Sequence, residues 1–206
     1  MQPKLIDHVA FWVAHRDAIS TAVLARLPWH VIDRQDNFTL LGGDARGFKL
    51  TLFDAEGPRE PGAFVQVALH APAADELDAG EGVRILLVES PDGDYELDHV
   101  TLRAHDPSAT AAEYERYGFR QNGTRAEVAG AAVEFIPGDP GTPARPLLNH
   151  IAVLVDSADE HVADAEELGI EVESVVDAAN TYAAFLRGPD GVRIEYVEHK
   201  PTFSLR

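Results

Sequence analysis

The sequence contains no cysteine and only three lysines among its 206 residues. The absence of cysteine excludes disulfides, thiolate metal sites and cysteine nucleophiles, so any metal ion must be held by nitrogen and oxygen atoms. Acidic residues outnumber basic ones by 35 to 17. The resulting negative field repels phosphate backbones and anionic lipids, so we expect neither nucleic acid nor a membrane as a partner.

Long hydrophobic runs are also missing. The apolar stretch at residues 6–14 is interrupted by Asp7 and His8 and has no basic leader, so it is predicted to be neither a signal peptide nor a membrane span. Cytoplasm is therefore the default expectation. A hydrophobic content of 45% is ordinary for a globular protein, and the length suits one compact domain or two small ones. Monomer and homo-oligomer both remain open.

The order of strand-like and helix-like segments repeats along the chain. Residues 5–13 have the composition of a strand, 17–27 have helical spacing, and three short strand-like segments follow up to residue 53. The same β-α-β-β-β order recurs over 95–136, where Asp106-Pro107 starts the helix, and over 148–198, where Ser157 and Glu160 form a capping box. A shorter copy, 63–89, has lost most of its helix.

Direct comparison of the segments supports four related units. The last strands Gly82-Val-Arg-Ile-Leu-Leu-Val-Glu89 and Gly191-Val-Arg-Ile-Glu-Tyr-Val-Glu198 agree at six of eight positions. The first strands also align, as Ile6-Asp-His-Val-Ala-Phe11, Leu97-Asp-His-Val-Thr-Leu102, Leu148-Asn-His-Ile-Ala-Val153 and, altered, Phe64-Val-Gln-Val-Ala-Leu69. We predict an α+β fold in which βαβββ modules form open, curved mixed sheets with helices on the outer face. Residues 1–92 would form one module pair, with its second module truncated, and residues 93–206 the other.

Four side chains occupy equivalent places in the last two units. Because side chains alternate along a strand, His99 and His150 lie on the face opposite the helices, and Glu134 and Glu195 lie on the last strands of their units. If the two sheets face one another, the four converge. Imidazole with carboxylate suits Fe²⁺, Mn²⁺, Ni²⁺, Co²⁺ or Zn²⁺.

The first two units lack carboxylates at these places. They offer His8 with Thr51 and Gln66 with Leu86. We therefore expect no metal site in residues 1–92 and interpret His8 as a packed or hydrogen-bonded strand residue. Three further histidines, one in a loop, one on a helix and one near the end of the chain, are predicted to be solvated: His105, His161 and His199.

A strand with Asp-His-Val or Asn-His-Ile, then a helix, then Gly-Pro-Asp-Gly-Val-Arg-Ile-Glu-Tyr resembles the vicinal oxygen chelate superfamily. This superfamily includes glyoxalase I, bleomycin and fosfomycin resistance proteins, methylmalonyl-CoA epimerase and extradiol dioxygenases. The resemblance covers the whole chain as a repeat and is most specific over residues 148–198. It implies paired βαβββ modules that curve around a divalent metal.

The extradiol dioxygenase branch implies iron held by His99, His150 and Glu195, in a 2-His-1-carboxylate arrangement that leaves positions for substrate and dioxygen. These enzymes generally carry an acid-base tyrosine ten residues before the carboxylate ligand. This chain has Phe185 there, and Tyr182, three residues earlier, is a partial substitute.

The glyoxalase branch implies a fourth ligand. A histidine or glutamine and a glutamate from each of two modules bind the metal there, which His99, Glu134, His150 and Glu195 would reproduce. In that branch a carboxylate ligand also moves the proton, so Glu134 or Glu195 would be both ligand and base. Bleomycin resistance proteins imply a third alternative, a metal-free binder whose acidic cleft suits cationic drugs.

The sequence thus predicts a metal-dependent enzyme acting on a small molecule with adjacent oxygens. An extradiol-type dioxygenase with Fe²⁺ is favoured; the alternatives are a glyoxalase- or epimerase-type lyase or isomerase, and the metal-free binder. The predicted metal ligands are His99, His150, Glu195 and Glu134, and the predicted catalytic residues are Glu134 and Tyr182.

Overall fold

The fold was analysed in a computed structural model, which describes residues 1–44 and 47–205. The first unit comprises β1 (Leu5–Val13), α1 (Arg16–Leu24), β2 (His30–Arg34), β3 (Phe38–Gly42) and β4 (Lys49–Asp54). The second comprises β5 (Phe64–Ala71), β6 (Asp75–Asp78) and β7 (Arg84–Glu89). The third comprises β8 (Leu97–Ala104), α2 (Pro107–Glu113), the 3-10 turn η1 (Tyr114–Tyr117), β9 (Arg120–Asn122), β10 (Arg125–Val128) and β11 (Ala131–Pro137). The fourth comprises β12 (Leu148–Leu154), α3 (Ala158–Glu167), β13 (Val172–Asp177), β14 (Thr181–Arg187), the 3-10 turn η2 (Pro189–Gly191) and β15 (Arg193–His199).

Local sequence signals account for most of these elements. The side chain of Asp106 caps α2 by accepting a hydrogen bond from the amide of Ala109 at 3.0 Å, and Pro107 follows at the first helical position. Ser157 caps α3 through the amide of Glu160 at 3.3 Å. The strand β6 was not expected, because Asp-Glu-Leu-Asp carries little strand propensity. It lies at the edge of its sheet, where it pairs with β7 alone.

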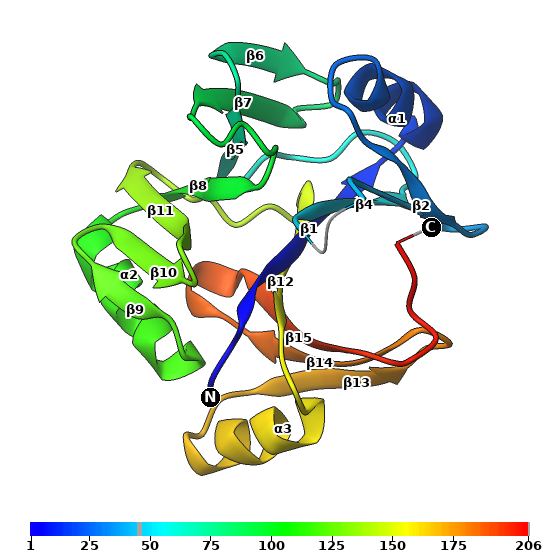
Figure 1. The fold of residues 1–206 in the computed structure, drawn as a ribbon. Coiled ribbons are helices and arrows are strands. Elements are labelled where there is room, and N and C mark those ends of the chain that lie inside the picture. The colour runs from blue at the N-terminus through cyan, green and yellow to red at the C-terminus, as the bar shows by residue number, and fades with distance from the viewer. Residues whose placement is uncertain (45–46, 206) are drawn as a thin grey trace.

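The first unit pairs with the fourth, and the second unit pairs with the third. One sheet has the order β13-β14-β15-β12-β1-β4-β3-β2, and the other has the order β6-β7-β5-β8-β11-β10-β9. The first unit therefore joins the fourth through antiparallel β1 and β12, and the second joins the third through antiparallel β5 and β8 (Figure 1). The expected division into residues 1–92 and 93–206 differs from this pairing, because each sheet draws strands from both halves. Four related repeats carry no local signal that says which units pair.

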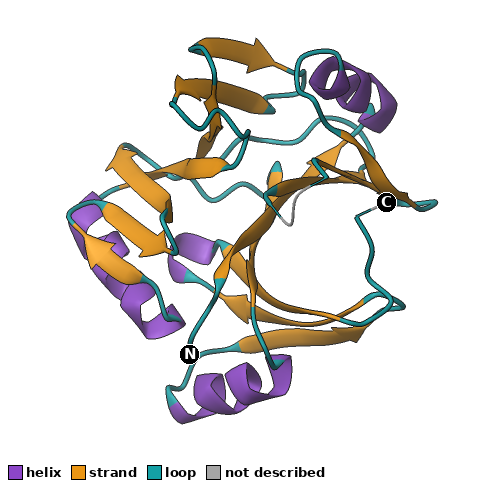
Figure 2. Cartoon of the chain, viewed as in Figure 1, coloured by secondary structure: helices purple, strands orange, loops and turns teal. Residues whose placement is uncertain are grey.

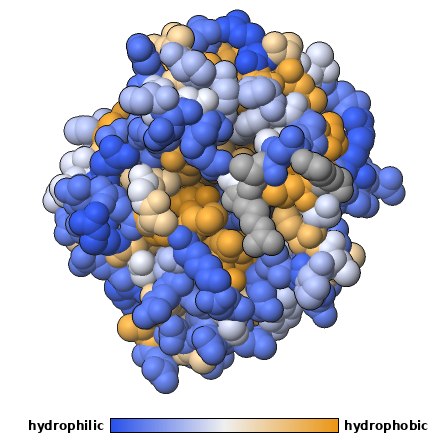
Figure 3. All heavy atoms as spheres, in the orientation of Figure 1, coloured by the Kyte–Doolittle hydropathy of each residue, from blue (hydrophilic) through white to orange (hydrophobic). Residues whose placement is uncertain are grey.

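Each sheet curves, and the helices cover its outer side (Figure 2). The first sheet, defined here by its eight strands from β13 to β2, curves around a space that residues from all eight strands line. On β1, Val9, Phe11 and Val13 are buried away from this space, while His8, Ala10 and Trp12 face it. Hydrophilic side chains dominate the face shown in Figure 3, and hydrophobic ones show mainly near its centre. The alternation thus separates a packed core from a concave surface.

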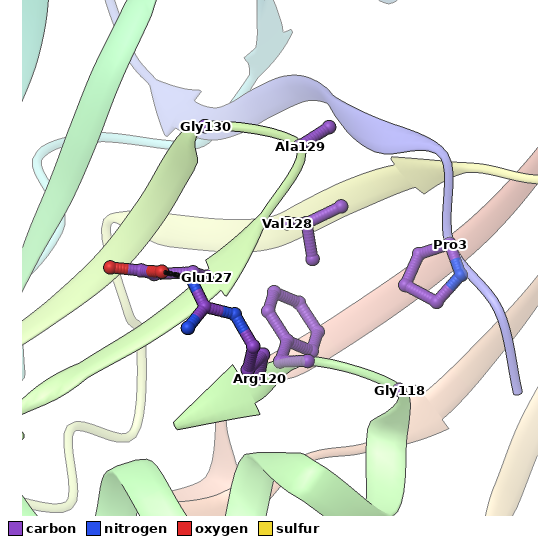
Figure 4. A pocket seen from close by; sticks show the side chains of 8 residues that line it. Pro3, Gly118, Arg120, Glu127, Val128, Ala129 and Gly130 are labelled. Atoms are coloured by element: carbon purple, nitrogen blue, oxygen red, sulfur yellow. Dashed lines mark hydrogen bonds and ion pairs between the residues drawn. The ribbon is translucent and has the colours of Figure 1, made fainter. Parts of the chain in front are cut away.

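The beginning of the chain packs against the third unit as well as the fourth. Pro3 lies over a small hollow of about 400 Å³ that includes Gly118 and the turn between β10 and β11 (Figure 4). Gly118 has a φ of 86°, and a Cβ there would lie only 2.6 Å from Pro3 Cδ, so glycine alone fits both the backbone and the contact. An Arg120–Glu127 ion pair borders the hollow.

Within the described residues, no helix is long and apolar enough to cross a membrane.

Candidate metal centre

Two histidines and a glutamate meet on the concave side of the first sheet. His8 comes from β1, His150 from β12 and Glu195 from β15. His8 lies opposite Ala152, and Ala152 pairs in turn with Glu195, so the strand register brings all three side chains together. Thr51 on β4 occupies the place that mirrors Glu195, since it pairs with Ala10 opposite His150.

The three ligand atoms form a nearly equilateral triangle. His8 Nε2 lies 3.0 Å from His150 Nε2 and 3.1 Å from Glu195 Oε2, and the third side, from His150 Nε2 to Glu195 Oε2, is 2.9 Å. With metal–ligand bonds of ~2.1 Å, adjacent positions of an octahedron are ~3.0 Å apart and those of a tetrahedron ~3.4 Å. The triangle fits one octahedral face. Glu195 Oε2 is also buried without a well-formed hydrogen bond, as a group awaiting a cation would be.

A β-bulge precedes each histidine. The pairing of β1 with β12 slips at Asp7 and again at Asn149, so each of these residues is the extra one in its strand. The bulge brings its side chain to the histidine that follows: Asp7 Oδ2 lies 2.9 Å from His8 Nδ1, and Asn149 Oδ1 lies 3.1 Å from His150 Nδ1.

These contacts select the tautomer of each ring. Asn149 Oδ1 also accepts from Arg193 Nη1 at 2.9 Å, so the amide oxygen faces His150 and the ring must donate from Nδ1. The Asp7 carboxylate can only accept. Both Nε2 atoms are thereby left with lone pairs that point into the triangle, as metal ligation requires.

Asp7 is itself held by two other side chains. Its Oδ1 lies 2.8 Å from Lys49 Nζ and 3.3 Å from His199 Nε2. Asp7 and Lys49 are both buried, and Lys49 donates a second hydrogen bond to the carbonyl of Gly47 at 3.0 Å. The ion pair compensates two charges that the interior would otherwise disfavour.

The protonation of the metal-free cluster follows from these neighbours. Burial acts to lower the pKa of His8, but the carboxylates of Glu195 and Asp7 outweigh it and raise that pKa to about 9. Burial lowers the pKa of His150 despite the attraction of Glu195. Burial acts to raise the pKa of Glu195, yet His150 and His8 hold it well below its ordinary value. The metal-free site therefore holds a proton on His8 beside an ionised Glu195.

A cavity of about 630 Å³ opens next to the triangle. Ala183 and Val197 line part of it, and with Ala152 they form a small cluster against Phe185. Five aromatic side chains also line it: Trp12, Phe38, Phe53, Phe185 and Phe203. The chain after β15 runs across the open side of the sheet toward β2, where the carbonyl of Leu205 lies 2.7 Å from His30 Nε2 (Figure 1). The site is thus enclosed by apolar surface.

The lysine and the arginine that line the cavity, among the described residues, are both already paired. Lys49 is bonded to Asp7, and Arg193 reaches Glu173 Oε2 at 2.5 Å and stacks on Phe185 at 4.5 Å. An anionic group on a ligand would have to compete with these carboxylates.

The structure brings together only two of the four predicted ligands. His150 and Glu195 meet as expected, but His99 and Glu134 lie in the second sheet, where His99 Nε2 is 3.2 Å from Glu134 Oε2. The expected convergence of all four is therefore wrong. The equivalence of positions was correct, but the fourth unit pairs with the first, so His8 stands where His99 was expected.

Tyr182 lies outside the cavity. Its hydroxyl donates to Asp159 Oδ1 at 2.7 Å on the helix side of the sheet, and the cavity surface carries Phe185, 5.2 Å from the His150 ring. Two histidines expected to be solvated are held in place instead. His161 is buried and accepts from the amide of Gln2, and His199 lines the cavity beside Asp7. The alternation of β15 could have placed His199 with Glu195, since they are four residues apart on one face.

Comparison with known proteins supports the fold. No protein-family model matches the sequence, and no curated protein matches it. A solved structure from Bacillus subtilis, described as a candidate dioxygenase, superposes with a TM-score of 0.77 at 16% identity over 98% of this chain and 87% of the other. A glyoxalase I mutant from Zea mays gives 0.76 at 15% identity over 95% and 94%. The architecture is that of the vicinal oxygen chelate proteins.

A further solved structure superposes over nearly the whole chain. The cppA protein from Streptococcus pneumoniae superposes with a TM-score of 0.67 at 14% identity, over 96% of this chain and 98% of the other. The predicted fold class is therefore confirmed, and the predicted resemblance holds at the level of the fold. At these identities the likeness concerns the fold, and the chemistry has to be argued from the site.

Proposed function

We propose that this protein is a divalent-metal enzyme whose centre is His8, His150 and Glu195, and that it is a dioxygenase acting on a small molecule with adjacent oxygens. The observation that carries the proposal is the triangle of ligand atoms, with sides of 2.9 to 3.1 Å, beside an open cavity. Two histidines and one carboxylate on one octahedral face are typical of non-haem Fe²⁺ oxygenases, so Fe²⁺ is the favoured metal.

The bound ion would supply Lewis acidity and free coordination positions for two substrate oxygens and dioxygen. The protein supplies the rest. His8 and His150 present their Nε2 lone pairs because Asp7 and Asn149 hold the opposite ring nitrogens. The aromatic walls exclude water and fit a planar ring, with Phe185 packed against the edge of His150.

Glyoxalase- or epimerase-type chemistry has less support. That branch needs a second carboxylate at the metal, and the place that mirrors Glu195 holds Thr51, whose hydroxyl does not act as a base. Glu134, proposed from sequence as that base, lies in the other sheet. A metal-free binder is less supported too, because such a pocket has no need for three ligand atoms within about 3 Å of one another.

The test begins with purified protein reconstituted anaerobically with Fe²⁺, Mn²⁺, Ni²⁺, Co²⁺ or Zn²⁺. Bound metal is measured, and each form is assayed for oxygen consumption with a panel of catechols and, in parallel, for conversion of a hemithioacetal. We expect one metal per chain and oxygen uptake with the Fe²⁺ form. Hemithioacetal conversion without oxygen uptake would favour the isomerase alternative, and a chain that binds none of the five metals would contradict both enzyme proposals.

A further inference from the structure

The two histidines of the proposed centre are backed by different chemical groups. Behind His8 stands the Asp7 carboxylate, and behind His150 stands the Asn149 amide, each delivered by a β-bulge. A carboxylate makes a charge-assisted hydrogen bond to an imidazole, roughly twice as strong as the bond that a neutral amide makes. The two ligands are therefore inequivalent although their strands are related by the repeat.

The charge on Asp7 is maintained by a dedicated partner. Lys49 is buried, its ammonium lies 2.8 Å from Asp7 Oδ1, and it is anchored by the carbonyl of Gly47 at 3.0 Å. With Lys49 in place, Oδ2 remains free to accept from His8 Nδ1 at 2.9 Å.

We propose that Asp7 is a positioning residue for the metal centre: paired with Lys49 and bonded to His8, its carboxylate makes His8 the stronger of the two histidine ligands. The inference rests on the proposed function, because it concerns how tightly the centre binds its metal. A carboxylate behind a ligating histidine fixes the ring and raises its basicity, and loss of such a partner typically weakens metal binding by ~10- to 100-fold.

The second sheet provides a matched control. Asp98 is also a bulge residue, its Oδ1 lies 2.6 Å from His99 Nδ1, and Arg125 Nη2 lies 3.1 Å from the same oxygen. It thus repeats the carboxylate, the histidine and the cationic partner, but at a place remote from the triangle. Asp98→Asn removes the same charge from the same local structure.

The experiment measures the dissociation constant for Co²⁺ by competition with a chromophoric chelator, on the full chain. Asp7→Asn keeps the size and an acceptor oxygen but leaves Lys49 unpaired. The double variant Asp7→Asn with Lys49→Met therefore tests the charge without a buried cation left over. We expect ~10- to 100-fold weaker binding in both, and a change of less than about twofold in Asp98→Asn. The visible spectrum of bound Co²⁺ should shift in the double variant and not in the control.

The outcomes separate the inference from the function it rests on. If the wild-type chain binds Co²⁺ and the double variant binds it equally well with the same spectrum, Asp7 is a structural residue only and the inference is overturned. A wild-type chain that binds no divalent metal overturns the proposed function and the inference together. In a complementary variant, Asn149→Asp, a carboxylate behind His150 should tighten Co²⁺ binding.

Discussion

The two sheets carry the same four concave positions and fill them differently. In the first sheet these positions hold His8, Thr51, His150 and Glu195. In the second sheet the same register relations select Gln66, Leu86, His99 and Glu134. Both contain one imidazole and carboxylate in contact, at 2.9 Å in the first and 3.2 Å in the second.

The first site differs from the second in having one more histidine and in being more deeply buried. The first site closes a triangle within a cavity, and Glu195 is nearly inaccessible to solvent. The second has Gln66 where the first has a histidine, and the Glu134 side chain is 29% exposed. A bulge before each histidine is common to both sheets, so the bulge belongs to the architecture. The second histidine and the burial distinguish the proposed metal centre.

The largest effect should come from removing the histidine of the first sheet, and removal of the equivalent histidine of the second sheet is its control. In His150→Ala the triangle loses a corner, and we expect metal binding at least ~100-fold weaker and a loss of oxygen uptake. His99→Ala removes the equivalent imidazole from the second sheet and should leave metal content at one per chain. Elemental analysis after dialysis measures the metal content of both variants. Full metal content in His150→Ala would show that the assignment of the centre is wrong.

Adding a histidine to the second sheet should make its site resemble the proposed metal centre of the first sheet. Gln66→His would place a second imidazole beside His99 and Glu134, in the register that His8 has beside His150 and Glu195. We expect a second, weaker metal site, because the more exposed Glu134 is better solvated without metal. Titration with Co²⁺ should show binding of up to two ions per chain, while an unchanged stoichiometry of one would mean that burial, and not only ligand identity, is required.

Two residues, His8 in the first sheet and Asp98 in the second, should contribute to stability with opposite pH dependence in the metal-free protein. The pKa of His8 is raised to about 9, so its stabilising contribution is complete below its unfolded value near 6.5 and is lost as pH rises through 9. Burial acts to raise the pKa of Asp98, but His99 and Arg125 lower it. Its contribution is present above its unfolded value of ~3.9 and is lost as pH falls further.

Chemical unfolding of the metal-free chain between pH 3 and pH 10 would measure both effects. The His8 contribution is on the order of 3 kcal/mol, and it should disappear from the alkaline side in His8→Gln. The smaller Asp98 contribution should disappear from the acidic side in Asp98→Asn. Identical pH profiles for the wild type and His8→Gln would contradict the arrangement of charges around His8.

The smallest effect is expected at Tyr182. Its hydroxyl contacts Asp159 on the helix side of the first sheet, so Tyr182→Phe should leave metal affinity and turnover within about twofold of the wild type. Steady-state oxygen uptake by the Fe²⁺ form is the measurement. A drop of tenfold or more in turnover, at unchanged metal content, would restore Tyr182 as a proton-transfer residue.

The sequence predicted the local structure well because each signal is local. The caps at Asp106 and Ser157 and the alternation around His150 depend on neighbouring residues only. The pairing of β1 with β12 is a contact between the two ends of the chain, and no motif in either strand specifies the partner. For that reason His150 and Glu195, which lie in one unit, were correctly predicted to lie together, and His8 was missed.

The union of β1 with β12 has a consequence for the order in which the protein is built. The second sheet is contiguous in sequence, from β5 to β11, so all its strands have been synthesised before the fourth unit. The first sheet needs β1 to wait for β12 and β15, which follow the whole second sheet in the chain. During synthesis, His8 therefore remains without His150 and Glu195 until the fourth unit has been made, and the proposed centre can capture its metal only after that.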